Sequence, residues 1–357
     1  MNIIQNRNFY FALSGLLVAG SIVAIAVYGL RLGIDFTGGA LSEITVDSRI
    51  AADAGIITQA LIAGESPALD SVRVQPTGAH GFLLRFKSVS EQEHHSIIMA
   101  LDAFLGELLP AEEETDVPLE QPDVDAAASG AVVDAVDSGG NPVAIDVVAS
   151  EPEAQPAGPE FLTEDRFESI GPVIGSELAQ KSMYAIVAVL IGIITYIAWA
   201  FRKVAEPVSS WKYGVTAIIA LAHDVIIPTG VFAVLGAVLG IEIDILFVTA
   251  LLTILGFSVN DTIVVFDRTR ENLARHHHKH EFTWIVEKSV NETMRRSLFT
   301  SLTTFVVLCS IFLYGGDSVK YFVLALMIGV IVGTYSSIFL ASPLLVVWEQ
   351  WSRRQGN

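Results

Sequence analysis

Six apolar stretches, each near the length of a membrane-spanning helix, constrain the fold of this chain more than any other feature. A bilayer core is crossed by about 20 apolar residues in helical form. The predicted spans are residues 9–30, 183–201, 215–235, 245–266, 298–314 and 323–347. With 52% hydrophobic and only 17% charged residues, the chain is too apolar for an ordinary soluble globule. We therefore predict a polytopic α-helical membrane protein.

Basic residues near the ends of these spans predict the orientation, because Lys and Arg are retained on the cytoplasmic side. Most of them fall on one side if both termini are cytoplasmic, and the two short outward loops, residues 236–244 and 315–320, then hold a single lysine. The apolar stretch of the first span is longer than that of a signal peptide, and no A-x-A cleavage site follows it. We expect residues 1–31 to be a cytoplasmic N-terminus and a retained anchor, and residues 182–357 to hold the other five spans and a cytoplasmic C-terminus.

The segment between the first two spans, residues 32–181, is predicted to form a soluble domain outside the membrane. Residues 31–181 hold 27 of the chain's 39 acidic residues but only 7 of its 21 basic ones, a charge that repels nucleic acid and anionic lipid. Alternating runs predict four strands, and helical spacing predicts two helices. The strands are expected at residues 42–46, 71–75, 81–86 and 166–171, and the helices at residues 53–63 and 91–109. Their order, βαββαβ, is typical of a ferredoxin-like α+β domain.

Residues 110–159 differ from the rest of this domain in composition. They are rich in Asp, Glu, Ala, Pro and Gly and contain no aromatic residue. Such a segment buries too little apolar area to offset its chain entropy. We expect an acidic, disordered insertion.

Asp261 carries the strongest chemical implication, because it lies inside an apolar run, whereas the next acid, Asp267, falls where that run ends. An ionised carboxylate in hydrocarbon costs about 2.5 to 3.5 kcal/mol on insertion scales, so acids kept there usually move ions. At about 1.5 Å per residue, Asp261 is expected roughly 7 to 8 Å from the cytoplasmic end of its span. There it can bind and release a proton.

A polar stripe opens the fifth span. Arg296, Thr300, Thr303 and Thr304 fall at offsets that place them on one helical face, which suits a hydrated proton path. The neighbouring Arg295 is instead expected to anchor the helix on the cytoplasmic side.

Asp224 lies near the middle of the third span, with His223 beside it. Two roles remain open for this acid: a part in ion passage, or a structural hydrogen bond to a neighbouring helix. Gly329 and Gly333 form a G-x-x-x-G pattern in the sixth span, which predicts a close helix contact.

At the predicted cytoplasmic mouth, Asp267, Arg268, Arg270 and Glu271 can pair at helical spacing, and we expect them to form a structural clamp. The HHHKH sequence that follows lacks the carboxylate or cysteine companions of a defined metal site, so we predict no metal.

Several motifs in fixed order carry a family resemblance: GIDFTGGALSEI from residue 33, ALAHDVIIPTG, IEIDI, IVVFDRTREN and MRRSLFTSLTT. With these motifs the chain resembles the SecF members of the SecD/SecF family of protein-export membrane proteins. The resemblance implies half of a resistance-nodulation-division transporter in the bacterial inner membrane, with a periplasmic domain between its first two spans. It implies SecD as the other half, the SecYEG translocon and a preprotein as partners, and the proton motive force as the driver of late translocation and release.

The same resemblance assigns residues. Asp261 and Arg296 match family positions implicated in proton passage, and the first motif would join the first span to the periplasmic domain. In this chain that motif contains Gly33, Asp35, Phe36, Gly38 and Gly39. No covalent chemistry and no cofactor are implied, and no phosphate-binding G-x-x-x-x-G-K-[ST] sequence occurs.

Three alternative functions are an intramembrane aspartyl protease, a structural subunit and a small-molecule exporter. An intramembrane aspartyl protease would pair Asp224 with Asp261, but the GxGD sequence of such enzymes is absent around either acid. A structural subunit that only positions SecD would keep export intact when Asp261 is neutralised. A small-molecule exporter of the same superfamily normally carries both halves in one longer chain. The sequence also leaves open whether protons or sodium ions drive transport.

Overall fold

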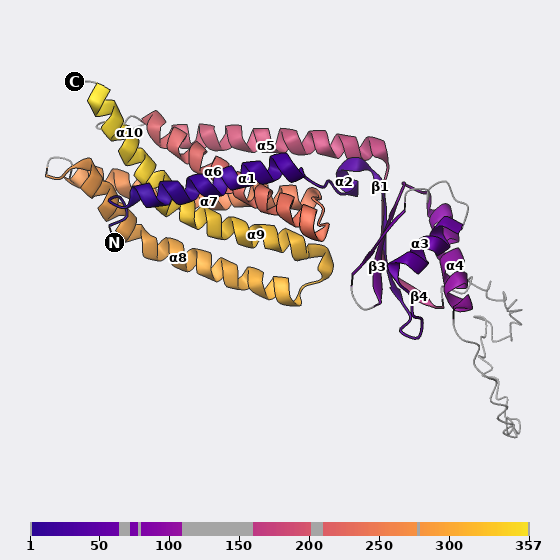
Figure 1. Cartoon of the computed structure of the whole chain (residues 1–357). Helices are drawn as coiled ribbons and strands as arrows, with labels where there is room; N and C mark the ends of the chain where they lie inside the picture. The colour runs from indigo at the N-terminus through magenta and orange to yellow at the C-terminus, as the bar shows by residue number, and fades with distance from the viewer. Residues whose placement is uncertain are drawn as a thin grey trace, which may run out of the picture. The chain divides into compact units, whose positions relative to one another are not determined.

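The structure is a computed structural model that describes residues 2–63, 72–77, 80–108, 160–200, 210–276 and 279–355. The chain divides into two compact units (Figure 1). The helical unit comprises Met1–Gly39 and Ser169–Asn357, and the sheet unit comprises Ala40–Glu168.

Long helices fill the helical unit, because a helix satisfies its backbone hydrogen bonds within one apolar segment. They are α1 (Arg7–Tyr28), α5 (Pro172–Ala200), α6 (Ser210–Leu239), α7 (Ile245–His276), α8 (Phe282–Tyr314) and α9 (Asp317–Ser336). A short helix, α2 (Ile34–Thr37), follows α1, and α9 continues through a π-helical turn, η1 (Ser337–Ala341), into α10 (Ser342–Gln355). Among the described residues, six helices are long and apolar enough to cross a membrane, which confirms the predicted six spans.

Several helices extend beyond the predicted spans. Helix α5 begins at Pro172, well before residue 183, and α8 begins at Phe282, well before residue 298. Hydropathy detects only the apolar part of a helix, whereas polar turns continue it through pairs at helical spacing. One such pair is Lys181–Glu177, with Nζ 2.7 Å from Oε1.

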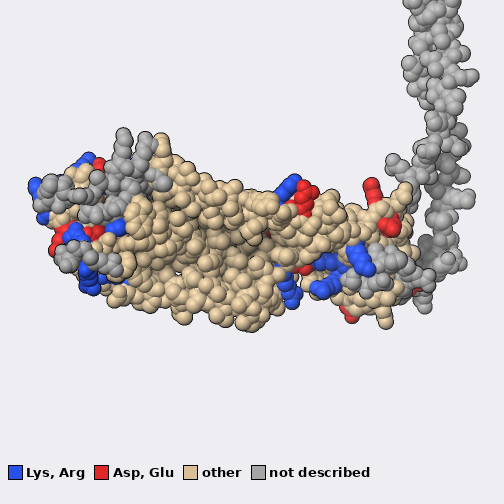
Figure 2. Space-filling view, turned by 90° about the horizontal axis from the view of Figure 1, so that it is seen from above, with Lys and Arg blue, Asp and Glu red and all other residues tan. Residues whose placement is uncertain are grey.

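Charged side chains are distributed as expected for a protein that lies in a bilayer. Figure 2 shows an uncharged band over the helices, with Lys, Arg, Asp and Glu gathered at the ends of the helical unit. The N- and C-terminal ends of the chain lie at the same end of this unit (Figure 1).

The sheet unit has the predicted ferredoxin-like order. Its elements are β1 (Gly39–Val46), α3 (Ala54–Ala63), β2 (Arg73–Pro76), β3 (Gly81–Phe86), α4 (Glu91–Glu107) and β4 (Leu162–Ile170). The strand order is β2-β3-β1-β4, and β3 pairs antiparallel with both β1 and β2. Alternate residues of β3, Phe82, Leu84 and Phe86, are buried in the core of the unit with side chains from α3 and α4. The predicted insertion at residues 110–159 lies outside the described residues.

Asp102 anchors the start of β4 to α4. Its Oδ1 accepts hydrogen bonds from the backbone N–H groups of Phe161 and Leu162, at 2.7 and 3.2 Å, and its Oδ2 accepts one from Glu160 at 2.9 Å. The side chain is almost fully buried. This carboxylate therefore fixes the strand that returns the chain toward the helical unit.

Candidate functional site

Asp224 lies on α6 and is completely buried, with 0% of its surface exposed. Its Oδ2 accepts hydrogen bonds from the Ser336 hydroxyl, at 2.7 Å, and from the Ser258 hydroxyl. Its Oδ1 lies 2.9 Å from Nδ1 of His223. Pro228, four residues along the helix, has no N–H to donate to the Asp224 carbonyl. The acid thus sits where α6 lacks one of its own hydrogen bonds.

Asp261 lies on α7 and is half-buried. Its Oδ1 accepts a hydrogen bond from the hydroxyl of Ser297 on α8. Its Oδ2 accepts one from the hydroxyl of Ser337, the first residue of η1, at 2.5 Å. Both hydrogen-bond partners of this acid among the described residues are therefore hydroxyl groups.

Adjacent residues at the junction of α9 and η1 contact the two acids. Ser336 ends α9 and bonds Asp224, while the next residue, Ser337, begins η1 and bonds Asp261. Single π turns inside α-helices are found frequently at functional sites. One turn of the chain thus contacts the acid of α6 and the acid of α7.

Close helix packing makes these contacts possible. Gly333 on α9 lies so near α7 that an added Cβ would be 3.1 Å from the Cβ of Ser258, and Gly329 likewise lies against Ile254. These contacts confirm the close approach predicted from the G-x-x-x-G pattern.

Hydroxyl partners have a specific chemical consequence. A hydroxyl can donate to an ionised carboxylate and can accept from a protonated carboxylic acid, whereas a backbone N–H can only donate. Ser297 and Ser337 can therefore satisfy Asp261 in either protonation state. His223 adds the same versatility at Asp224, because a neutral imidazole nitrogen either donates or accepts according to its tautomer.

Arg296 and the threonine stripe are placed differently from these serines. Arg296 is exposed on α8 and forms no ion pair with a carboxylate in the described part of the chain. The hydroxyl of Thr300 donates to the Arg296 carbonyl at 2.9 Å, and those of Thr303 and Thr304 donate to the Thr300 carbonyl. The residue of α8 that contacts Asp261 is therefore Ser297, the residue after Arg296. The Arg296 side chain lies on an exposed face of α8.

The four charged residues at the end of α7 form ion pairs. Arg270 pairs with Asp267 at 2.6 Å, and Arg268 pairs with Glu271 at 2.5 Å. Arg268 also contacts Glu292 on α8 at 2.6 Å, a partner that helical spacing within α7 does not indicate. These pairs connect the ends of the two helices that carry Asp261 and Ser297.

The glycine-rich motif after α1 contacts the start of α7 and of α5. Asp35 accepts a hydrogen bond from the backbone N–H of Ile245, the first residue of α7, at 2.8 Å. Gly33 donates its N–H to the Ile243 carbonyl at 2.8 Å. Gly38 has φ +72°, and an added Cβ would lie 2.6 Å from the Pro172 Cα at the start of α5.

Other members of the motif complete this junction. Phe36 packs against the buried apolar cluster around Phe247 and Ile254. Gly39, with φ +136°, begins β1. The motif thus connects the end of α1 with the starts of α5 and α7. Helix α7 is the one that carries Asp261.

Four serines of the site, Ser258, Ser297, Ser336 and Ser337, are not distinguished by the sequence alone. A serine within an apolar helix commonly bonds the carbonyl of its own preceding turn, as Thr300 does here. The sequence contains two weak signals for the site. Ser258 precedes Asp261 by three residues, and Ser336 and Ser337 are adjacent. That pattern does not reveal which helix the hydroxyl faces.

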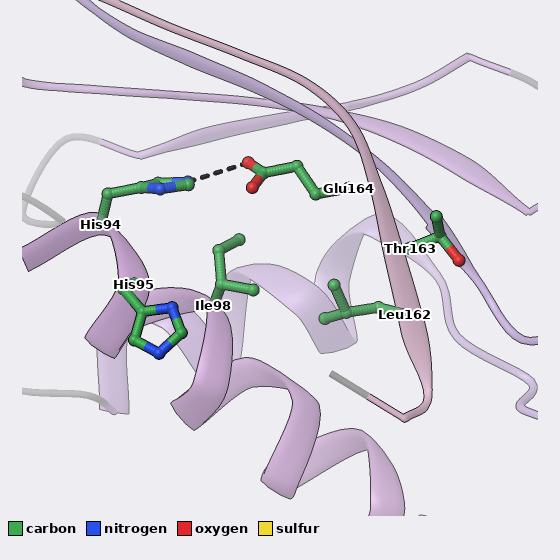
Figure 3. Close-up of a pocket in the computed structure, with 6 residues that line it drawn as sticks. All are labelled: His94, His95, Ile98, Leu162, Thr163 and Glu164. Atoms are coloured by element: carbon green, nitrogen blue, oxygen red, sulfur yellow. Dashed lines mark ion pairs between the residues drawn. The ribbon is translucent and has the colours of Figure 1, made fainter. Parts of the chain in front are cut away.

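The sheet unit carries a separate hollow of about 380 Å³ (Figure 3). His94 of α4 points toward Glu164 of β4, with Nε2 2.8 Å from Oε1, and the Ser42 hydroxyl donates to the same oxygen at 2.6 Å. The His94 ring also stacks on Phe167. None of the predicted site residues lines this hollow. Over the described residues, no group of three His, Cys, Asp or Glu side chains could hold a metal ion.

Two protein-family profiles match the sequence. The profile described as "Protein export membrane protein SecD/SecF, C-terminal" covers residues 151–351, and that described as "SecD/SecF GG Motif" covers residues 23–48. The chain belongs to the SecD/SecF family. The second profile contains the glycine-rich motif that caps α7, and the first contains both intramembrane acids and the π turn.

Individual relatives support the SecD/SecF assignment. "Protein translocase subunit SecF" of Thermobaculum terrenum is 36% identical over 98% of this chain and 94% of its own length. The protein of the same name from Anaerolinea thermophila is 31% identical over 98% of this chain. The crystal structure of SecDF from Thermus thermophilus, described as a translocon-associated membrane protein, matches with a TM-score of 0.70 and 26% identity over 98% of this chain. This chain spans 39% of that SecDF chain.

Proposed function

We propose that this chain is the SecF subunit of a Sec protein-export machinery. Together with SecD, it would use the proton motive force to promote late preprotein translocation through SecYEG and release on the periplasmic side. The names of the relatives and the match to SecDF support this proposal. The chain spans 39% of the SecDF chain, and we propose that a separate SecD half associates with it.

The observation that carries the coupling role is the pair of serine hydroxyls on Asp261. An acid fixed by cations or backbone N–H groups would resist protonation, whereas Ser297 and Ser337 can hold both forms in place. Asp261 can then take up a proton and release it without loss of its hydrogen bonds. Such a group suits an intramembrane proton carrier.

We propose that the proton path is lined on one side by Asp261 and on the other by Arg296, Thr300 and Thr304. Arg296 lies next to Ser297 in sequence and is exposed on α8, together with apolar neighbours such as Leu298 and Leu302. An exposed apolar face of this kind is expected to be covered by lipid or by the SecD half. We place Asp224 in the same proton-coupling group because its partner Ser336 adjoins Ser337, the partner of Asp261.

The proposed orientation is that of a multi-pass protein of the bacterial inner membrane with both termini in the cytoplasm. The two ends of the chain lie at one end of the helical unit, where charged side chains gather (Figures 1 and 2). Basic residues concentrate on the cytoplasmic side of membrane proteins. This orientation makes the sheet unit periplasmic and makes the pairs among Asp267, Arg268, Arg270 and Glu271 a cytoplasmic clamp.

The proton gradient supplies enough free energy to shift a conformational equilibrium of the helical unit. One elementary charge that crosses 100 mV releases about 2.3 kcal/mol, which biases a two-state equilibrium about fiftyfold. Asp261 lies roughly 24 Å along α7 from Ile245, at about 1.5 Å per residue. Because Asp35 caps Ile245, a shift of α7 would reach the segment that leads into β1.

The test is gradient-stimulated preprotein translocation in inverted vesicles that contain the Asp261→Asn chain with its SecD partner. We expect normal assembly of the complex and loss of the stimulation by an imposed proton gradient. Asp267→Asn is the matched control, because this exposed acid lies on the same helix and its surface ion pair contributes only about 0 to 1 kcal/mol. A sodium gradient in a parallel arm identifies the ion.

A structural role is the alternative. A subunit that only positions SecD predicts full gradient-stimulated translocation in Asp261→Asn, provided that the complex assembles. That result would contradict the coupling role and leave the export subunit assignment in place.

A further inference from the structure

Asp224 is bonded to a serine that lies about one helical turn from Asp261. Ser258, which donates to Asp224, precedes Asp261 by three residues on α7, and residues at this spacing lie on the same face with Cβ atoms about 5 to 6 Å apart. The two acids are therefore close, but each binds its own hydroxyl groups. Two ionised carboxylates close together in such an interior would repel each other, so a proton on one would favour the ionised form of the other.

Ser336 and Ser337, at the junction of α9 and η1, each have a second acceptor. The Ser336 hydroxyl lies 2.7 Å from Asp224 Oδ2 and 3.1 Å from the Gly333 carbonyl oxygen. The Ser337 hydroxyl lies 2.5 Å from Asp261 Oδ2 and 3.0 Å from the Thr334 carbonyl oxygen. Each hydroxyl can therefore donate to an ionised acid, or accept from the protonated acid and donate to the helix carbonyl.

The other titratable groups around the pair are few in the described structure. His223 contacts Asp224, is 4% exposed, and has an Nε2 without a hydrogen-bond partner among the described residues. Its ring stacks on Tyr335, whose hydroxyl donates to the carbonyl of Tyr10 on α1. Arg296 of α8 adjoins Ser297, which binds Asp261. None of these groups is a cation paired directly with either acid, apart from His223 when it is protonated.

This arrangement leads to an inference that rests on the proposed coupling role of Asp261. We propose that Asp224 is a second proton-binding group coupled to Asp261, and that Ser336 and Ser337 are the positioning residues that set the balance of charge between the two acids.

Opposite effects of two adjacent serines follow. Removal of the Ser336 hydroxyl takes a donor from ionised Asp224, so Asp224 stays protonated and Asp261 ionises more easily. Removal of the Ser337 hydroxyl takes a donor from ionised Asp261, so Asp261 holds its proton to higher pH. A purely structural role for the two serines predicts no such difference in sign.

The experiment measures the pH at which dicyclohexylcarbodiimide, which reacts with protonated carboxylic acids in membranes, modifies half of Asp261. The full chain is used in membranes with its SecD partner, and the modified peptide is quantified by mass spectrometry. We expect Asp224→Asn and Ser336→Ala each to move the midpoint to lower pH by about one unit, and the double variant to add nothing further. Ser337→Ala should move it to higher pH.

Ser342→Ala is the matched control. Ser342 is buried at the start of α10 and donates to the Ser337 carbonyl without contact to either acid. The midpoint for Asp261 in this variant should equal that in the chain without a substitution. If Asp261 titrates but Asp224→Asn and Ser336→Ala leave its midpoint unchanged, the coupling is refuted and the proposed function stands. If Asp261 shows no pH-dependent modification, both are refuted. If Asp224→Asn fails to assemble, Ser336→Ala decides.

Discussion

Asp102 in the sheet unit and Asp261 in the helical unit are both acids held inside a packed structure, but by different donors. Asp102 accepts three backbone N–H groups, which can only donate. Asp261 accepts two serine hydroxyls, which can donate or accept. The donors therefore separate an acid that fixes a strand from an acid that can exchange a proton.

Two surface acids of the sheet unit have lowered pKa values. Hydrogen bonds from the Arg49 side chain and backbone lower the pKa of Asp47 to about 2. Hydrogen bonds from Ser90 also lower the pKa of Glu93 at the start of α4. Hydrogen bonds alone thus do not indicate a proton-exchange site, because the exposed Glu93 also accepts a bond from a serine hydroxyl. The difference in donors matters for the two acids inside the packed units, Asp102 and Asp261.

The sharpest test of this comparison removes both hydroxyls from Asp261. In Ser297→Ala/Ser337→Ala, the ionised acid loses two hydrogen bonds that are each worth about 1.5 to 3 kcal/mol. We expect at least a tenfold loss of gradient-stimulated translocation with the complex intact. Ser310→Ala, which removes an exposed hydroxyl bonded to its own helix, should have no effect. Equal losses in the two variants would show that the hydroxyls of Asp261 have no special role.

The same amide substitution should act differently in the two units. In Asp102→Asn, the new NH₂ group would face the Glu160 N–H and leave this donor unsatisfied, at a cost of about 1 to 3 kcal/mol. Amide hydrogen exchange at residues 160–162 should accelerate about tenfold or more. Asp261→Asn should leave exchange in α7 unchanged. Comparable destabilisation in both variants would break the distinction between fixed and exchanging acids.

Gly38 tests the connection between the two regions. Its φ of +72° and ψ of 163° disfavour any residue with a Cβ, by roughly 1 to 3 kcal/mol, and the added atom would meet the Pro172 backbone. We expect Gly38→Ala to destabilise the start of α5, as measured by hydrogen exchange, and to weaken translocation. Gly20→Ala on α1, where nothing lies within 4 Å of the added Cβ, is the control and should be tolerated.

The smallest expected effect concerns the cap of α4, where Ser90 and Glu93 form a capping box. Ser90→Ala should cost about 1 kcal/mol in helix stability. Because the pKa of Glu93 is lowered in the folded state, its contribution is complete above the ordinary glutamate pKa and is lost as the pH falls through the lowered value. Hydrogen exchange in α4 should therefore accelerate on acidification, and Glu93→Gln should remove this pH dependence. A pH dependence that persists in Glu93→Gln would exclude this source.

Much of the fold follows from local sequence patterns. Apolar length gives the six spans, and alternating runs give the βαββαβ order, because both signals are contained in a short stretch of chain. The ends of α5 and α8 are missed because their polar turns are stabilised by pairs rather than by hydropathy.

The site is only partly visible in the sequence. Asp224 and Asp261 stand out because acids are costly in apolar runs. Pro228 is a further unusual residue in the helix of Asp224. The partners of the acids do not stand out, since neither the helices that Ser336 and Ser337 face nor the π turn that begins at Ser337 is marked by a local sequence pattern. The threonine stripe illustrates the reverse case: Thr300 and Thr304 share a helical face, yet their hydroxyls bond their own helix.

Infrared difference spectroscopy of the assembled complex in membranes tests the central claim most directly, because the protonated carboxylic acid has its own C=O absorption. As the pH falls, we predict the appearance of a carboxylic acid band that is lost in Asp261→Asn and retained in Asp267→Asn. A spectrum in which Asp261→Asn leaves every pH-dependent carboxylic acid band in place would contradict the claim that Asp261 exchanges a proton.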